Sequence, residues 1–246
     1  MIKPEGGSRV VIVPCFNESK RIISSNFLSL VDELKCKILF VDDGSTDDTV
    51  SKLRSLPIVS SAYSIVSLPK NGGKANAIST GIRVALDNDF EFIGLFDADG
   101  AINPIDLGAA FSLIESTPDV SVVTGARVLL AGNGVTRKPQ RRWIGRVIAT
   151  LVSLIIEIQV YDPQSPCKVY RATDLKKISN LQVDTKWFGD AEVLFQLKQV
   201  VTQESKWILE FPVTSWQDVD GSNLSLLSFF RILGDLKRLS RKCVSF

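Results

Sequence analysis

Short apolar runs that alternate with helical patterns constrain the fold of this chain more than any other feature. The runs are four or five residues long and rich in Val, Ile and Phe, which is typical of buried strands. They lie at Val10–Val13, Ile38–Val41, Ser64–Leu68, Phe92–Phe96 and Val120–Thr124. Helical patterns separate them at about 19–34, 47–54, 73–86 and 105–116. This alternation predicts an α/β fold with a mostly parallel central sheet flanked by helices.

The second half of the chain has a different pattern. A polar, basic loop is expected over Gly132–Arg142, and a long apolar helical pattern follows at Trp143–Val160. Further on, the sequence predicts a Pro-containing loop or strand at 162–170, a helix at 189–201, a strand at 207–213 and a last helix at 226–239. Because no stretch has the composition of a linker, we expect a single domain over residues 1–246.

Composition excludes several kinds of site. The 246 residues contain no histidine, which rules out His-ligated zinc, Ser-His-Asp triads and imidazole bases. The formal net charge of +2 gives no general field for nucleic acid. The four cysteines show no CxxC spacing, and no apolar run reaches the roughly 18 residues of a membrane span, so we expect a reduced, cytoplasmic chain.

Three polar clusters follow predicted strands, at Pro14–Glu18, Asp42–Asp48 and Asp97–Asp99. In open parallel sheets, ligands bind beyond the carboxyl ends of the strands, so we expect the three clusters to share one crevice. Within the second cluster, Ser45 and the last aspartate have the spacing of a helix capping box. The first two aspartates precede the turn, where they could accept hydrogen bonds from a ribose or a base edge.

The third cluster has the pattern of a metal site. Asp97 and Asp99 form a DxD pattern, and an extended backbone would direct both carboxylates to the same side. Oxygen-rich sites of this kind suit Mg²⁺ or Mn²⁺, with substrate phosphates completing the shell. The glycines of Lys70–Lys74 open a predicted helix, as in many anion sites. Neither a P-loop motif nor GxGxxG occurs in the sequence, which disfavours both of those nucleotide folds.

In combination, these segments resemble a known family. VVIVPCFNE, VDDGSTDDT, KNGGKANAI and DADGAINP, in this order, are similar to the donor-binding half of a family 2 glycosyltransferase with the GT-A fold. In the second half, RKPQRRWIGRVIATLV, YDPQSPCKVYRA, WFGDAEVLF and WQDVDGSNLSLLSFFRILGDL resemble the polyprenyl- and dolichyl-phosphate glucosyl- and mannosyltransferases. The resemblance implies a donor-binding half up to about residue 130 and an acceptor- and membrane-facing half beyond it.

The resemblance also implies an activity and a set of site residues. We expect an inverting, metal-dependent hexosyltransferase that moves glucose or mannose from a UDP- or GDP-linked sugar to a polyprenyl phosphate. It would act as a peripheral protein at the inner face of the cell membrane. Asp190, Arg127 and Lys168 would act at the reacting centre, and Asp97 and Asp99 would hold Mg²⁺ or Mn²⁺. The nucleotide sugar would be bound by Pro14, Asn17, Glu18, Asp43, Lys74, Asp97 and Gln164.

Three positions depart from the pattern of this family. Ser165–Cys167 replaces a Cys-Gly-Phe-like segment, so we expect a different pocket wall there. Gly189 stands where a Phe is expected before Asp190, which would loosen the acceptor site. Asn223 replaces a common Lys, which would remove one phosphate contact.

Two apolar helical stretches favour a lipid-linked acceptor and contact with a membrane surface. Trp143–Val160 carries apolar residues at helical spacing, and Leu226–Lys242 combines Leu and Phe with Arg and Lys. A basic amphipathic helix of this kind is typical of a helix that lies on anionic lipid. The basic residues of 137–146 are candidate partners of the acceptor phosphate. Burial of the two helices against each other is the alternative.

Other functions stay open from the sequence alone. A family 2 enzyme that acts on a glycan or another lipid hydroxyl would need Asp190 as a general base, whereas a phosphate acceptor is already anionic. A nucleotidyltransferase usually carries a Gly-rich basic loop after its first strand, where this chain has Pro14–Glu18. A binding module without activity is disfavoured, because both carboxylates of the DxD pattern are present.

Overall fold

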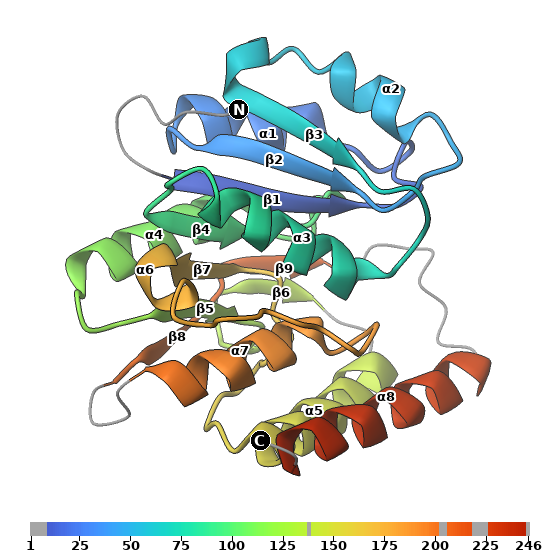
Figure 1. Ribbon diagram of the computed structural model, residues 1–246, viewed down its shortest axis with the longest axis vertical. Helices are drawn as coiled ribbons and strands as arrows, with labels where there is room; N and C mark the ends of the chain where they lie inside the picture. Colours follow the sequence, from blue (N-terminus) through green and yellow to red (C-terminus); the bar gives the residue numbers. More distant parts are fainter. Residues whose placement is uncertain (1–8, 137–138, 202–205, 218–225, 245–246) are drawn as a thin grey trace.

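The computed structural model describes residues 9–136, 139–201, 206–217 and 226–244 (Figure 1). These residues form a seven-stranded sheet of order β3-β2-β1-β4-β7-β5-β8. Neighbouring strands are parallel except at β7, which is antiparallel to both β4 and β5. The mostly parallel sheet expected from the sequence is therefore confirmed. The strands are β1 (Arg9–Cys15), β2 (Lys37–Asp42), β3 (Tyr63–Ser67), β4 (Phe92–Leu95), β5 (Val122–Ala126), β7 (Lys168–Arg171) and β8 (Ile208–Pro212).

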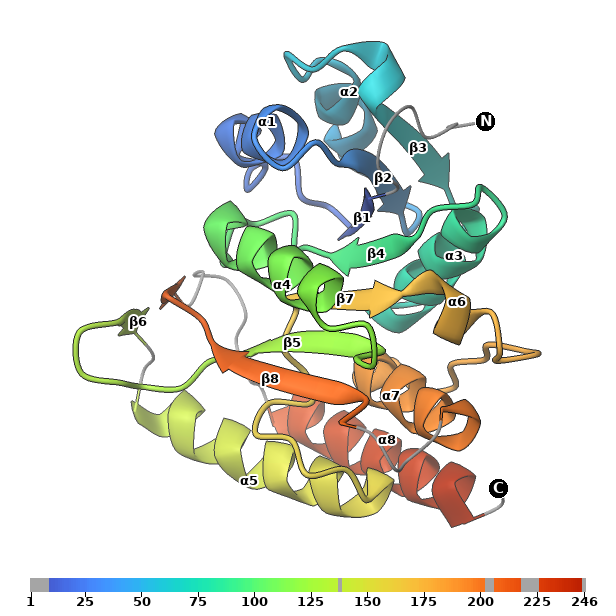
Figure 2. The ribbon, with the colours of Figure 1, turned by 90° about the vertical axis from the view of Figure 1, so that its left-hand side faces the viewer.

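Helices cover both faces of this sheet, with α1 and α4 on one face and α3 and α7 on the other (Figure 2). A short 3-10 helix, η1 (Ser60–Ala62), precedes β3, and β6 (Gly134–Thr136) pairs with β9 (Ser215–Gln217) in a small parallel sheet. The helices are α1 (Ser24–Asp32), α2 (Thr49–Arg54), α3 (Lys74–Leu86), α4 (Pro104–Ser116), α5 (Pro139–Ile156), α6 (Ala172–Leu175), α7 (Gly189–Val200) and α8 (Leu226–Val244).

Two helices differ in extent from the sequence-based expectation. α1 begins five residues later than expected, because the backbone N–H and the hydroxyl of Ser19 both donate to Asp47 in a neighbouring loop. α5 begins at Pro139 and ends before Glu157, instead of covering 143–160. Proline suits the first turn of a helix, and the φ of 53° at Glu157 is a left-handed conformation that ends one.

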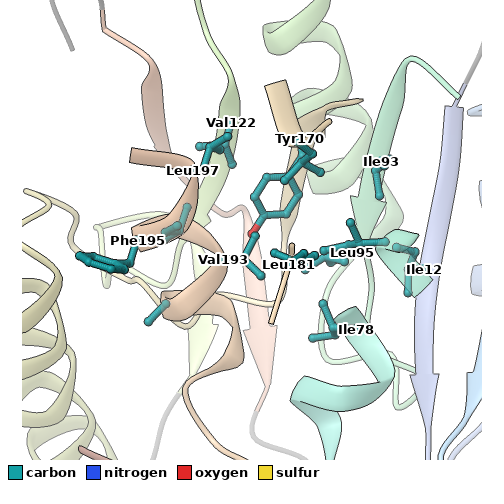
Figure 3. Packing of buried hydrophobic residues seen from close by; sticks show 14 of the residues in the cluster. Ile12, Ile78, Ile93, Leu95, Val122, Tyr170, Leu181, Val193, Phe195 and Leu197 are labelled. Atoms are coloured by element: carbon teal, nitrogen blue, oxygen red, sulfur yellow. The ribbon is translucent and has the colours of Figure 1, made fainter. Parts of the chain in front are cut away.

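Alternate residues of β1 divide the core into two clusters. Val10 and Ile12 are buried with side chains of α3 and α7, whereas Val11 and Val13 are buried with side chains of α1 and α4. Successive side chains of a strand point to opposite faces, so a strand covered on both faces is apolar throughout. Tyr170 of β7 belongs to the first cluster and points toward α7 (Figure 3).

α5 and α8 lie side by side beyond α7, at the end of the molecule farthest from β3 (Figures 1 and 2). Val152 and Ile156 of α5 and Ile232, Leu236 and Leu239 of α8 are buried in the cluster that α7 also joins. One face of each helix is therefore core, in agreement with the packing alternative. In the described part of the chain, no helix is long and apolar enough to span a membrane.

Some residues singled out in the sequence lie outside the described residues. These are Arg137, Lys138 and Asn223. The side chains of 139–141 and 226–231 are likewise not described, although the backbone of both stretches is helical.

Candidate active site

The site lies where the order of the strands changes direction. β2 and β3 continue the sheet on one side of β1, and β4 lies on the other, so the crevice beyond β1 and β4 is a topological switch point. Glu18 follows β1, and Asp97 and Asp99 follow β4. Because β7 runs in the opposite direction, its first residue, Lys168, pairs with Leu95 at the end of β4. The same edge therefore receives segments from both halves of the chain.

Asp97 and Asp99 lie in a turn, and the expected extended backbone is wrong. The N–H of Gly100, which has a φ of +69°, donates to the Asp97 carbonyl at 3.5 Å. The Asp99 carboxylate accepts the N–H of Ala101 at 3.1 Å. Burial raises the pKa of Asp99, and the negative charge of Asp97 raises it further. The turn therefore brings the two carboxylates close enough to interact electrostatically.

Glu18 adds a third carboxylate near this turn. Its Oε1 forms an ion pair with Arg21 at 2.6 Å, while its buried Oε2 accepts no hydrogen bond from any described residue. Burial raises the pKa of Glu18; the charge of Arg21 opposes this, and those of Asp99 and Asp97 add to it. A buried oxygen without a partner, beside two other carboxylates, suits a hard divalent cation.

The protein ligands would not complete such a coordination shell. Within the described ranges, no three His, Cys, Asp or Glu side chains are arranged to hold a metal ion on their own. Glu18, Asp97 and Asp99 have the oxygen chemistry that Mg²⁺ or Mn²⁺ prefers, but they are not arranged as a three-ligand site, so phosphate oxygens or water would supply most of the ligands.

Lys74, the first residue of α3, provides a cation at the same place. Its Nζ lies 2.5 Å from Oδ1 of Asp97, and its side chain is 46% exposed. Partial loss of water around its ammonium group tends to lower the pKa of Lys74, but the charges of Asp97, Asp190 and Asp99 raise it overall. The adjoining cavity of about 690 Å³ is in the usual size range of a small-molecule site. It is lined by Phe16, Asn71, Gly73, Lys74, Ala75, Ile78, Lys186, Trp187, Gly189 and Asp190.

Asp43 and Asn17 join the loops around the site to one another. Asp43 accepts the N–H groups of Gly72 at 3.0 Å and Gly73 at 2.7 Å, at the start of α3. Asn17, which has a φ of 53°, accepts the N–H of Thr46 at 2.9 Å through its Oδ1. Asp43 is only 2% exposed. In the structure both side chains therefore shape the loops, and Pro14 lies partly exposed near the end of β1.

The capping box expected at Ser45 and Asp48 is wrong. Asp48 precedes α2 without a capping hydrogen bond from its side chain, and the Ser45 hydroxyl accepts the N–H of Asn17 at 3.0 Å. The turn is pressed against the loop before α3: a Cβ added at Gly44 would lie 2.8 Å from the carbonyl carbon of Lys70. Contact between loops, and not helix capping, therefore determines the shape of this segment.

Arg127, which follows β5, is bound by Asp162. The two side chains form hydrogen bonds of 2.6 Å and 2.9 Å, and the guanidinium lies 4.7 Å from the centre of the Trp216 ring. Burial alone would raise the pKa of Asp162, but Arg127 holds it below its ordinary value. The charges of Asp97 and Asp190 also reach Arg127. Arg127 is thus paired with a carboxylate before any substrate binds.

Lys168 and Asp190 lie close together, but only Asp190 lines the cavity. Lys168 is fully buried, and its Nζ donates to the carbonyl oxygen of Ser165. Burial lowers the pKa of Lys168, against the charges of Asp190 and Asp162. Asp190 is 8% exposed, lines the cavity, and has an Oδ1 that accepts no hydrogen bond from any described residue.

Gly189 does not loosen the site, contrary to the expectation from sequence. A Cβ added there would lie 2.3 Å from the Cβ of Ala75 and 3.1 Å from the side chain of Val183. The glycine instead allows the start of α7 to approach the start of α3 closely. The Asp190 and Lys74 side chains are brought to one cavity by this contact.

A second hollow adjoins the site along α5. A small pocket of about 40 Å³ is lined by Arg127, Leu129, Val135, Arg142, Arg146 and Tyr161. Arg146 stacks on the ring of Tyr161 at 3.6 Å and donates to its carbonyl at 2.5 Å. The same two residues also line an apolar hollow of about 680 Å³ beside the second half of α5.

Sequence reasoning missed Arg21, Asp162 and Trp187. Arg21 stands three residues after Glu18, a spacing that could have indicated the pair. Asp162 is an isolated acid in a mostly apolar stretch, which is a signal that a basic partner is nearby. Trp187 carries no signal in the sequence, although the Gln164 amide donates to its carbonyl at 3.0 Å.

Comparisons with known proteins agree with these features. The model of the family described as Glycosyl transferase family 2 matches residues 10–179. A dolichyl-phosphate beta-glucosyltransferase of Trichomonas vaginalis is 25% identical over 93% of this chain and 69% of its own length. The corresponding protein of Saccharomyces cerevisiae is 26% identical over 88% of this chain and 69% of its own. A solved mannosyltransferase of Pyrobaculum calidifontis, in complex with GDP-Man and Mn²⁺, has the same fold with a TM-score of 0.66, at 18% identity, over 100% of this chain and 67% of that one.

Proposed function

The chain belongs to glycosyl transferase family 2 and has the GT-A fold, and on this basis we propose that it moves a hexose from a nucleoside diphosphate sugar to a polyprenyl phosphate. The family and the fold expected from the sequence motifs are thereby confirmed, and the chain is a glycosyltransferase. The donor, the acceptor, the metal and the roles of single residues are parts of the proposal.

The donor would occupy the cavity at the start of α3. Its diphosphate would lie at Asp97, Asp99 and Glu18, where a bound Mg²⁺ or Mn²⁺ neutralises the charge of the departing nucleoside diphosphate. Lys74 would place its ammonium group beside the same phosphates. Asp43 and Asn17 would hold the surrounding loops in the conformation that the nucleoside contacts.

An exposed apolar stripe on α5 is the observation that carries the proposed acceptor. Trp143 is 73% exposed and Leu154 68%, and Val147 and Leu151 lie between them at helical spacing. Leu154 of the stripe lines the apolar hollow beside α5, which shares Arg146 and Tyr161 with the arginine-lined pocket beside Arg127. A polyprenyl phosphate has the same two parts, an anionic head and an apolar chain. The relatives named as dolichyl-phosphate beta-glucosyltransferases support this choice.

The same stripe would place the protein on the cytoplasmic surface of a membrane. α8 lies beside α5 and exposes Lys237, Arg238 and Arg241. Apolar side chains on one helix and basic ones on its neighbour suit the interface of an anionic bilayer. We therefore keep 143–160 and 226–242 as the proposed membrane contacts.

A donor screen tests the proposed reaction. The full chain is incubated with Mg²⁺ or Mn²⁺, a short-chain polyprenyl phosphate and labelled UDP- and GDP-sugars, one at a time. We expect label in the organic phase with one hexose donor. Donor consumption without a labelled lipid would overturn the acceptor, and the absence of both turnover and nucleotide binding would overturn the donor class.

A hydroxyl acceptor is the second candidate, and the geometry of Asp190 favours it. An unpartnered carboxylate oxygen beside the donor cavity is suited to accept a proton from a hydroxyl group. An Asp190→Asn variant separates the two acceptors. With a phosphate acceptor we expect substantial activity to remain, whereas a hydroxyl acceptor would lose nearly all turnover.

A further inference from the structure

The segment 184–188, directly before α7, is held by side chains. Each of its five consecutive backbone N–H groups donates to a side-chain oxygen. Asp184 and Thr185 donate to Glu192, Lys186 and Trp187 donate to Asp235, and Phe188 donates to the hydroxyl of Thr185. Because these N–H groups bond to side chains and not to other backbone groups, the backbone conformation of the segment depends on the side chains that accept them.

Asp235 is the acceptor that comes from outside this region. It lies on α8, is 3% exposed, and accepts the N–H of Lys186 at 2.9 Å and that of Trp187 at 3.2 Å through one oxygen, Oδ2. Its other oxygen accepts a hydrogen bond of 2.9 Å from Arg238. Hydrogen bonds to an ionised acceptor are stronger than those between neutral groups. A single carboxylate therefore joins α8 to the segment before Asp190.

A second contact lies closer to the C-terminal end of α8. Lys242, seven residues after Asp235, places its Nζ 2.7 Å from Glu192 and 2.8 Å from Asp184. Seven residues are about two helical turns, so both contacts lie on one face of α8. α8 thus contacts this region twice. Asp235 binds backbone N–H groups of the segment, and Lys242 binds the side chains of Asp184 and Glu192.

The segment and the first turn of α7 both line the donor cavity. Lys186 and Trp187 of the segment and Asp190 of α7 lie on its wall, and the carbonyl of Trp187 accepts a hydrogen bond from the amide of Gln164 at 3.0 Å. The peptide that Asp235 binds is three residues from Asp190. A rotation of this peptide would change the direction in which α7 begins and would move both side chains relative to Lys74.

We propose that Asp235 is a positioning residue of this site: from α8 it holds the backbone N–H groups of Lys186 and Trp187, and thereby sets Trp187 and Asp190 against the donor. The inference rests on the proposed transferase function. In this proposal α8 affects turnover although the helix does not contact the substrate. A displacement of about 1 Å at a reacting group can lower turnover by up to about a hundredfold, so the positional effect is measurable.

Three variants of the full chain test the role. Asp235→Asn keeps an oxygen that can accept both N–H groups, and Asp235→Leu has a similar size but no acceptor. Leu239→Ala is the matched control, because Leu239 is buried at 0% in the same helix and its loss weakens core packing. The readouts are kcat and KM from the release of nucleoside diphosphate, together with hydrogen exchange of the amides in 184–188.

We expect Asp235→Leu to lower kcat about tenfold or more, with the donor KM changed less than about twofold. The amides of Lys186 and Trp187 should exchange faster in this variant, while those of Asp184 and Thr185 stay protected. Asp235→Asn should recover most of the kcat, and Leu239→Ala should keep the kcat of its folded fraction.

Two results would overturn the inference. One is a wild-type kcat in Asp235→Leu with unchanged exchange at Lys186 and Trp187. The other is an equal loss of kcat in Leu239→Ala, with no recovery in Asp235→Asn, which would make Asp235 a stabilising residue alone. Failure of the proposed acceptor is distinguishable, because nucleoside diphosphate release does not require a lipid product. If the wild type turns over no donor, the exchange pattern still decides whether Asp235 holds the segment.

Discussion

The carboxylate of Asp162 binds both Nε and Nη2 of Arg127, and so joins the loop after β5 to the loop before β7. Glu210 of β8 accepts the N–H of Asp162 at 2.8 Å and that of Tyr161 at 2.6 Å, which fixes the position of the carboxylate. Two parts of the chain that are 35 residues apart are therefore locked together beside the site.

Asp162→Asn should destabilise the protein by about 3–5 kcal/mol at neutral pH, because it leaves a buried guanidinium without its counter-charge. The pKa of Asp162 is lower in the folded state than its ordinary value, so folding releases a proton as pH approaches that value from below. Its stabilisation is present above the ordinary pKa and is lost as pH falls through the lowered one. Urea unfolding at several pH values should show that the difference in free energy of unfolding between wild type and variant becomes smaller in acid. Asp89→Asn, which removes an exposed ion pair with Lys176, should change stability by less than about 1 kcal/mol.

Asp99→Asn should reduce turnover at saturating donor by about a hundredfold or more, since a metal that neutralises a departing diphosphate contributes several kcal/mol. Titration of Mg²⁺ and Mn²⁺ should also show a higher half-saturating concentration. Asp119→Asn, which changes an exposed acid on a loop, serves as the control with unaltered kinetics. An unchanged metal response in Asp99→Asn would contradict the assignment.

Gly189→Ala should cost about 1–3 kcal/mol of folding free energy, because the new methyl group meets the Cβ of Ala75. Ala75→Gly in the same chain removes the nearer obstacle, so we expect the double variant to recover part of the loss. Denaturant unfolding of the two single variants and the double variant forms a complete cycle. Simple additivity of the single effects would show that the two residues do not determine the distance between α3 and α7.

Replacing both Trp143 and Leu154 by Gln should lower binding to anionic vesicles at least about tenfold, since each large apolar side chain contributes about 1.5–3 kcal/mol when buried. Co-sedimentation with vesicles measures the effect, and added salt should weaken the part due to α8. Ile105→Gln is the matched control, because Ile105 is 65% exposed on α4, on the other face of the sheet. Equal loss of binding in the control would mean that 143–154 is not the contact.

The strands of the first half could be predicted because their signals are local. Val10–Val13 and Ile38–Val41 are continuous apolar runs, as strands buried on both faces require, and acids follow them. This was enough to predict that Glu18, Asp97 and Asp99 meet at one edge. The sequence also indicated a strand or loop near 162–170, where β7 begins.

The direction of β7 could not be read from its residues. Its four residues are compatible with either orientation, and only pairing with β4 and β5 fixes it. Asp43 is a similar case: its carboxylate binds a loop 29 and 30 residues away, and no local pattern shows that. The contact between Asp235 and Lys186 spans 49 residues. Such contacts depend on the assembled fold, so the sequence indicated a candidate site and left its supporting contacts undefined.

The reversal of β7 also brings the two ends of one long stretch of the chain together. Residues 127–166 leave the end of β5 and return at the start of β7, and the N–H of Gly125 bonds to the carbonyl of Cys167 at 2.8 Å where the ends meet. A stretch whose ends are already adjacent changes in length at little entropic cost. It includes α5 and the arginines beside it, but none of the carboxylates that follow β1 and β4. The loops of this stretch can therefore change in length while the edge beyond β1 and β4 stays in place, although α5 itself must keep the face that packs in the core.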